Sequence, residues 1–227
     1  MGAVYTIARM TFLEARRNRV FGVLVFFCLT MVLSGFLFQE VTITTLDRVL
    51  RDVGLGAADA FGLILSVFLG VSVVTREIER RTVYLLLGKP VSRGQYLLGK
   101  LLGVWLTIAV LMAMMVAAYT LEARLLRSTT PIIIYEAFWL MLVELWTISS
   151  FSVLSSTFTS SIMSAFLSLS LYVIGELSSS IYFLAKKVHV DWAKPLLHGI
   201  MYILPNFENL NLKDEASLTT PVPFTRV

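Results

Sequence analysis

Long stretches of this chain carry no charged residue over a length that can cross a membrane. Residues 20–38 are uncharged for nineteen residues and residues 101–121 for twenty-one. A helix of about 20 apolar residues, rising about 1.5 Å per residue, spans a hydrocarbon core of about 30 Å. The chain is 57% hydrophobic and 15% charged, whereas soluble domains carry about 25% charged residues. These features predict an integral membrane protein.

The remaining apolar runs predict an all-α, polytopic membrane fold. It consists of one N-terminal interfacial helix and five transmembrane helices. The predicted spans are residues 20–38, 57–74, 101–121, 132–155 and 162–184. Small residues recur at every fourth position of the second span, namely Ala58, Gly62, Ser66 and Gly70. Such a ladder lets another helix approach closely, so we expect it to serve helix packing.

The N-terminal segment, residues 1–19, is amphipathic on a helical projection. Its apolar face consists of Val4, Ala8, Phe12 and Ala15. Arg9, Arg16 and Arg17 gather on another face. We interpret the segment as an elbow helix in the membrane interface. The alternative is a basic flank that only sets the orientation of the first span.

The segment between the second and third spans, residues 75–100, is the longest polar and strongly basic part of the chain. It holds six of the nineteen Lys and Arg residues. Thr75 is a candidate N-cap for a first short helix, which Pro90 would stop. Ser92 followed by Gln95 is a capping box that starts a second helix running into the third span. We interpret the segment as a cytoplasmic hairpin.

Charge asymmetry indicates the orientation. The segments predicted to lie inside, 1–19 and 75–100, hold ten Lys and Arg in about 45 residues, against nine in about 70 for the outside segments. The N-terminus is therefore predicted to be cytoplasmic, as is the serine-rich turn between the last two spans. Residues 185–227 are predicted to be extracytoplasmic.

Acidic residues inside the predicted spans are the candidates for chemistry. Glu144 lies near the middle of the fourth span, where a charge costs about 2.5 to 3.5 kcal/mol or more, and Glu176 lies in the fifth. The two could face one cavity. They would line a translocation path or a subunit seam, or each would be a protonated glutamate bonded to a serine of these spans, such as Ser149, Ser152 or Ser178.

The hairpin carries a resemblance to a known family. The pattern E-x-E-x-x-T-x-x-x-L-L-x-x-P-V-S-R-x-x-x-L-L-G-K covers residues 77–100. It resembles the loop between the second and third spans of type 2 ATP-binding-cassette exporter permeases, and most closely the multi-copper-enzyme-maturation permeases. In that family the loop holds a coupling helix, which sits in a groove of a separate ATPase subunit. The resemblance implies that the coupling residues here are Glu77, Glu79, Arg81, Thr82, Leu85, Leu86, Leu87, Pro90 and Arg93.

The resemblance also implies the assembly. This chain would be a permease subunit that is not itself an enzyme, with ATP and Mg²⁺ bound by the partner ATPase. A second permease chain, often identical, would complete the path in a bacterial or archaeal inner membrane, with a possible extracytoplasmic accessory protein. The family plan has six spans, and no sixth apolar run occurs before Val227; we expect that the sequence is part of a longer subunit.

Other functional classes find little support in the sequence. The stretch GQYLLGKL, residues 94–101, matches part of a phosphate-binding loop, but Leu101 replaces the Ser or Thr that holds Mg²⁺. The single Cys28 and the histidines His189 and His198 form no metal-binding spacing. The basic residues flank apolar runs, which does not favour nucleic-acid binding. Two alternatives stay open: a membrane scaffold that docks a cytoplasmic partner without transport, and an intramembrane enzyme using Glu144 and Glu176 as its acid pair.

The predicted orientation can be tested by cysteine labelling in intact cells. A membrane-impermeant thiol reagent should not reach Arg80→Cys or Arg93→Cys until the membrane is permeabilised. Arg48→Cys, in the predicted outer loop, is the positive control. Labelling of position 80 or 93 from outside would place the hairpin on the wrong side of the membrane.

Overall fold

The computed structural model describes residues 2–17, 21–39, 46–79, 92–126, 128 and 130–177. All regular secondary structure in these ranges is helical. The predicted extracytoplasmic segment 185–227 and the last part of the predicted fifth span lie outside them. The helices are α1 (Gly2–Arg17), α2 (Phe21–Gln39), α3 (Leu46–Glu79), α5 (Arg93–Leu125), α6 (Ile133–Ser155) and α7 (Ser161–Glu176).

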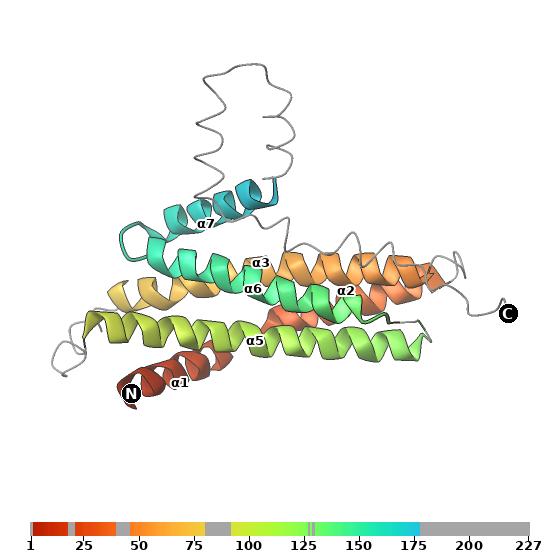
Figure 1. Ribbon diagram of the computed structural model, residues 1–227, viewed down its shortest axis with the longest axis horizontal. Helices are drawn as coiled ribbons and strands as arrows, with labels where there is room; N and C mark the ends of the chain where they lie inside the picture. Colours follow the sequence, from red (N-terminus) through yellow and green to blue (C-terminus); the bar gives the residue numbers. More distant parts are fainter. Residues whose placement is uncertain are drawn as a thin grey trace, which may run out of the picture.

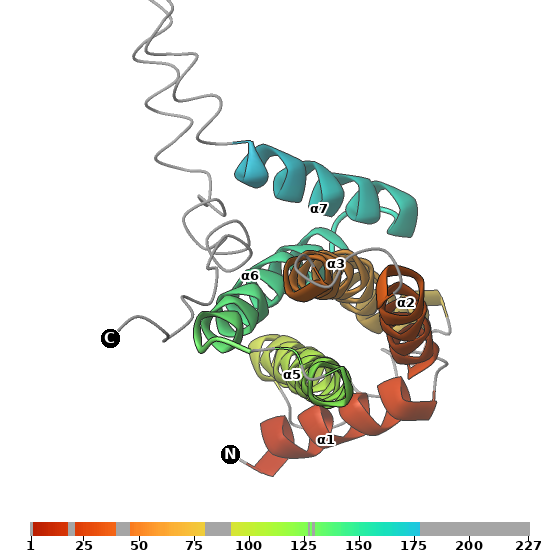
Figure 2. The same ribbon diagram turned by 90° about the vertical axis from the view of Figure 1, so that its right-hand side faces the viewer.

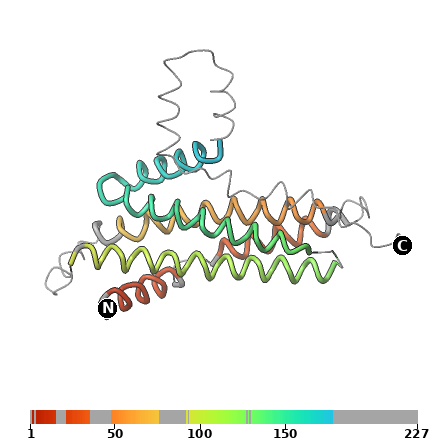
Figure 3. The backbone as a smooth tube through the Cα atoms, viewed as in Figure 1, coloured from red at the N-terminus to blue at the C-terminus, as the bar shows by residue number. Residues whose placement is uncertain are grey.

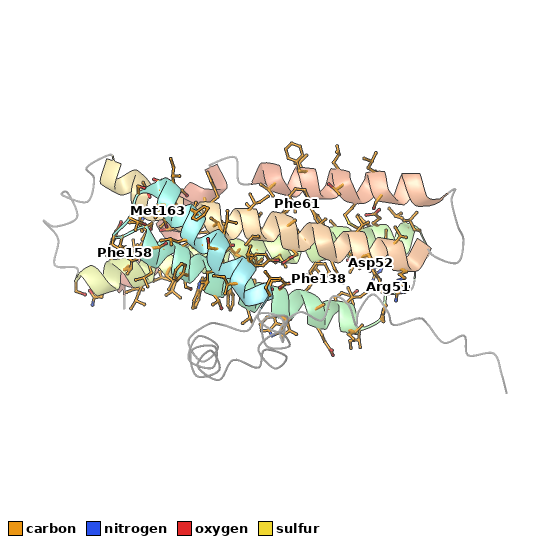
Figure 4. The ribbon with its side chains drawn as sticks, turned by 90° about the horizontal axis from the view of Figure 1, so that it is seen from above. Arg51, Asp52, Phe61, Phe138, Phe158 and Met163 are labelled. Carbon is orange, nitrogen blue, oxygen red and sulfur yellow. The ribbon has the colours of Figure 1, made fainter. Side chains whose placement is uncertain are left out.

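The long helices form one elongated bundle. Helices α2, α3, α5 and α6 run side by side along its length (Figure 1). Seen from one end, α1 crosses beside α5, and α7 lies on the opposite side against α3 and α6 (Figure 2). The backbone tube shows α7 diverging from the bundle axis (Figure 3). Arg51 and Asp52 mark one end of the bundle, and Phe158 and Met163 lie toward the other (Figure 4).

The helices have the length and composition of a membrane domain. Within the described ranges, three are long and apolar enough to cross a bilayer: Arg48–Thr75, Gly94–Leu125 and Ile133–Ser155. Two shorter apolar helices, Gly22–Gly35 and Ser161–Glu176, coincide with the predicted first and fifth spans. Large apolar side chains such as Phe26, Ile64 and Leu106 stand on the outside of the bundle. Since water would penalise such a surface, the all-α polytopic membrane fold is confirmed.

Helix α3 is longer than the sequence pattern predicted. The second span was predicted to begin at residue 57, but α3 runs without a break from Leu46. Leu50, Gly54, Leu55 and Ala58 continue one buried face across the predicted boundary. Arg51 lies among them with 2% of its surface exposed. The charged residues around position 50 suggested a solvated segment, but the apolar residues between them form a stripe that belongs to the bundle core.

The other end of α3 also differs from expectation. Thr75 does not cap a new helix, because its hydroxyl donates to the carbonyl of Val71, 2.9 Å away, and α3 continues to Glu79. A threonine hydroxyl that bonds one turn back on its own helix is compatible with an unbroken helix. The second capping prediction is confirmed: Ser92 and Gln95 form a reciprocal capping box at the start of α5. From there α5 continues without a break through the third predicted span.

Glycines set the closest approaches between helices. A Cβ on Gly62 would lie 2.6 Å from Leu145 Cδ1, and one on Gly70 would lie 2.5 Å from Ser152 Cβ, so α3 touches α6 along its small-residue ladder. The other ladder members, Ala58 and Ser66, are fully buried.

A second pair of glycines brings α5 against α1. Cβ atoms on Gly99 and Gly103 would lie 2.8 Å from Ile7 Cβ and 2.5 Å from Thr11 Cβ. These two glycines form a G-x-x-x-G pattern, a signature of close helix approach.

Gly103→Ala should destabilise the bundle, whereas Gly94→Ala should not. A methyl group on Gly103 would also lie 2.8 Å from the backbone oxygen of Ala8, which cannot rotate away. Overpacking of this kind costs about 1 to 3 kcal/mol. Gly94 has nothing within 4 Å of its added Cβ and serves as the matched control. Thermal unfolding of both variants in detergent measures the difference, and equal melting temperatures would contradict the observed α1–α5 contact.

Candidate functional site

A group of polar side chains is enclosed where α3, α6 and α7 meet. The Tyr172 hydroxyl of α7 donates a 2.8 Å hydrogen bond to Oδ2 of Asp59 on α3. The carboxyl groups of Glu176 and Glu144 lie close enough to the same hydroxyl to interact with it electrostatically. Three helices therefore contribute to one polar group of four residues, which we call the acidic cluster: Asp59, Glu144, Tyr172 and Glu176.

Glu144 is the most enclosed member of the acidic cluster. Only 1% of its surface is exposed, so it faces the interior of the bundle and not lipid. That position follows from the cost of placing a carboxylate in hydrocarbon. A residue at a seam between two chains would be exposed in the isolated chain. Burial of Glu144 inside one chain thus argues against a place at the subunit seam.

Two members of the acidic cluster were not singled out from the sequence. Asp59 lies two residues inside the predicted second span. Tyr172 precedes Glu176 by four residues, so the two lie on the same face of α7. An acid inside an apolar helix, and a tyrosine one turn from a membrane glutamate, are the signals that could have found them.

The serines proposed as partners of the glutamates have other contacts. Ser149 donates to the carbonyl of Trp146, 3.0 Å away. Ser152 Oγ lies 2.9 Å from the carbonyl oxygen of Ile148 and 2.8 Å from Ser168 Oγ. Ser178 lies outside the described ranges.

A network of buried hydroxyl groups joins α6 to α7. Besides the contact between Ser152 and Ser168, Ser164 of α7 donates to the carbonyl of Ser152 at 3.1 Å, and its hydroxyl bonds that of Ser155. None of these four serines is exposed. The hydroxyl network secures the ends of α6 and α7 next to the turn that connects them.

Two tryptophans connect α5 to α6. The indole N–H of Trp105 donates to the carbonyl of Trp146 at 3.2 Å and to Ser150 Oγ at 3.1 Å. The indole N–H of Trp146 donates to the carbonyl of Trp105 at 3.1 Å. The rings are stacked, with centroids 5.2 Å apart and planes inclined by 15°. We call this arrangement the tryptophan pair.

The tryptophan pair is a strong contact by the standards of membrane proteins. Hydrogen bonds between transmembrane helices average about 0.6 kcal/mol each. Stacked aromatic rings contribute about 0.5 to 1.5 kcal/mol beyond their burial. Two reciprocal bonds and one stack therefore stabilise the α5–α6 contact by about 2 kcal/mol.

The predicted coupling residues fall at or beyond the limits of the described structure. Glu77 and Glu79 belong to the last turn of α3, and Arg93 to the first turn of α5. These two helix ends lie at the same end of the bundle as the turn between α6 and α7 (Figure 1). The other predicted coupling residues lie outside the described ranges: Arg81, Thr82, Leu85, Leu86, Leu87 and Pro90.

No metal-binding geometry is found in the part of the chain that the structure describes. It holds no group of three or more His, Cys, Asp or Glu side chains that could bind a metal ion. Cys28 is a half-buried free thiol. His189 and His198 lie outside the described ranges.

The fold and the enclosed polar residues define a polytopic membrane protein with an all-helical membrane domain. The sequence matches the model of the ABC-2 family transporter proteins over residues 5–191, and the chain belongs to this family. It is accordingly a membrane permease subunit of an ABC transporter. No curated protein matches the sequence.

Removing the hydroxyl group of Tyr172 should weaken the contact between α3 and α7. Tyr172→Phe and Asp59→Ala each lose the 2.8 Å bond, so the double variant should be hardly less stable than either single variant. Hydrogen bonds between transmembrane helices contribute about 0.6 kcal/mol on average, which sets the expected coupling energy.

The coupling energy is measured by unfolding four proteins in detergent: the unsubstituted protein, the two single variants and the double variant. Tyr135→Phe, at an exposed position on α6, is the control for loss of a tyrosine hydroxyl. Strictly additive effects of the two substitutions would show that the bond contributes nothing.

Proposed function

We propose that this chain is the permease of an ABC exporter and that it couples ATP hydrolysis in a separate ATPase subunit to export of a substrate. ATP and Mg²⁺ are bound by that partner. Two permease chains, most simply two identical copies, form the path in the inner membrane of a bacterium or archaeon. The N-terminus is on the cytoplasmic side, and an accessory extracytoplasmic protein fits the same plan. Membership of the ABC-2 family carries the proposal.

The structure supports a mechanical form of coupling. The proposed coupling hairpin, residues 75–100, includes the end of α3 and the start of α5, and these helices contain 34 and 33 residues. Each is therefore a continuous rod of about 50 Å. Because neither helix is interrupted between this segment and the membrane, a displacement produced by the ATPase acts directly on both.

The acidic cluster is the proposed polar part of the path. It is enclosed by α3, α6 and α7, and Glu144 is almost completely buried. Separation of α7 from α3 would break the bond between Tyr172 and Asp59 and would expose the carboxyl groups of Glu144 and Glu176. Ion pairing or proton exchange at these groups would then become possible during transport.

The coupling contacts can be tested by charge reversal. The double variant Glu77→Lys with Arg81→Glu should insert normally yet abolish the ATP hydrolysis that the permease stimulates, because both charges would oppose their partners on the ATPase. Hydrolysis by the purified complex is the measurement. Arg124→Glu, an exposed charge near the opposite end of α5, is the control.

Two further observations separate the proposal from its alternatives. Co-purification of an ATPase distinguishes a permease from an intramembrane enzyme. ATP-dependent transport into inverted vesicles distinguishes it from a scaffold. Unchanged hydrolysis in the charge-reversal variant would contradict the assigned coupling residues.

A further inference from the structure

The tryptophan pair differs from the other contacts between helices in that each indole bonds to the backbone of the opposite helix. Trp105 reaches the carbonyl of Trp146 at 3.2 Å, and Trp146 reaches the carbonyl of Trp105 at 3.1 Å. Since backbone atoms cannot rotate to follow a moving partner, a slide of one residue, about 1.5 Å, would break both bonds together. The contact fixes the register of α5 against α6.

Along the helices, the tryptophan pair lies between the start of α5, where the ATPase is proposed to act, and the acidic cluster. Trp105 is twelve residues from Arg93, at the start of α5, and two residues beyond Gly103, where α1 contacts α5. Trp146 is two residues from Glu144 on α6. Among the described helix contacts, this pair is therefore a direct link from the helix that leaves the coupling segment to the helix that carries the most buried acid.

The contacts of α6 with its other two neighbours differ in kind. The hydroxyl network holds α7 to α6 through Ser152 and Ser164. The contacts of α3 with α6 at Gly62 and Gly70 are close van der Waals contacts of small residues, which lack the fixed donor–acceptor geometry of the bonds in the tryptophan pair.

We propose that Trp105 and Trp146 are positioning residues that join α5 and α6 into one rigid unit, which carries α7 with it and moves against α3 when the ATPase acts. This inference rests on the proposed function and goes beyond it by identifying the moving unit. Its consequence is that the bond between Tyr172 and Asp59, which joins α7 to α3, crosses the boundary between the moving and the stationary helices. Motion would open the acidic cluster at that boundary.

Distances between spin labels in the complete transporter complex test the proposal. One label pair, at Leu121 and Tyr135, spans α5 and α6, and the other, at Arg48 and Tyr135, spans α3 and α6; all three positions are exposed. Cys28→Ser provides a background without the natural thiol. On trapping with ATP and vanadate, the α5–α6 distance should stay constant, while the α3–α6 distance should shift by about 2 Å or more.

Substitution of the tryptophan pair should remove this rigidity. In Trp105→Phe, which loses one indole donor, and in the double variant with Trp146→Phe, the α5–α6 distance should broaden and should change on trapping. The α3–α6 shift should shrink while ATP hydrolysis continues. Trp139→Phe, an exposed tryptophan on α6, is the matched control and should behave as the unsubstituted protein does. The single variant keeps one bond and serves if the double variant does not fold.

The outcomes separate the two claims. A change in the α5–α6 distance in the unsubstituted complex would contradict the proposal that α5 and α6 move as one unit. Identical behaviour of the Trp105→Phe and Trp139→Phe variants would contradict it too. Neither result would contradict the proposed exporter function. If neither distance changes with ATP, the proposed coupling between the ATPase and the permease is wrong. The proposal that α5 and α6 transmit its motion would then fail as well.

Discussion

Inside an apolar bundle, polar side chains have no water to bond, and this constraint organises the contacts of the protein. The enclosed indole N–H groups and the serine and tyrosine hydroxyls described above bond to another helix or back onto their own. Indole N–H groups reach carbonyl oxygens across α5 and α6, serine hydroxyls link α6 to α7, and Tyr172 bonds Asp59 between α7 and α3. Because an unsatisfied polar group in such surroundings costs several kcal/mol, these bonds resist separation of the helices.

Small residues provide the complementary type of contact. Where α3 meets α6 and where α1 meets α5, glycines bring the helices so close that a methyl group would not fit. In a membrane, lipid tails are as apolar as the core, so close van der Waals packing replaces much of the hydrophobic driving force. Directional bonds join α5 to α6, α6 to α7 and, through Tyr172 and Asp59, α7 to α3, whereas α3 meets α6 at Gly62 and Gly70 by close packing of small residues.

The differences between the sequence-based expectation and the structure have specific physical causes. Charged residues at positions 47–52 concealed the apolar stripe through Leu50 and Leu55, so α3 was predicted to begin near residue 57 and begins at Leu46. Thr75 resembles a helix cap in sequence, but its hydroxyl bonds Val71 of its own helix. Asp59 and Tyr172 were overlooked because their meeting depends on the crossing of α3 and α7, which no local pattern encodes. The capping box at Ser92 was predicted correctly because all of its atoms lie within four residues.

The sequence by itself determined that the chain is an all-α membrane protein and where α5 begins, because length, hydropathy and capping depend on neighbours along the chain. It also carried the resemblance that the family match over residues 5–191 bears out. Only the tertiary structure decided that Trp105 and Trp146 bond each other's backbones and that Tyr172 of α7 bonds Asp59 of α3. Those contacts join residues 41 to 113 positions apart, and they follow from how the helices cross.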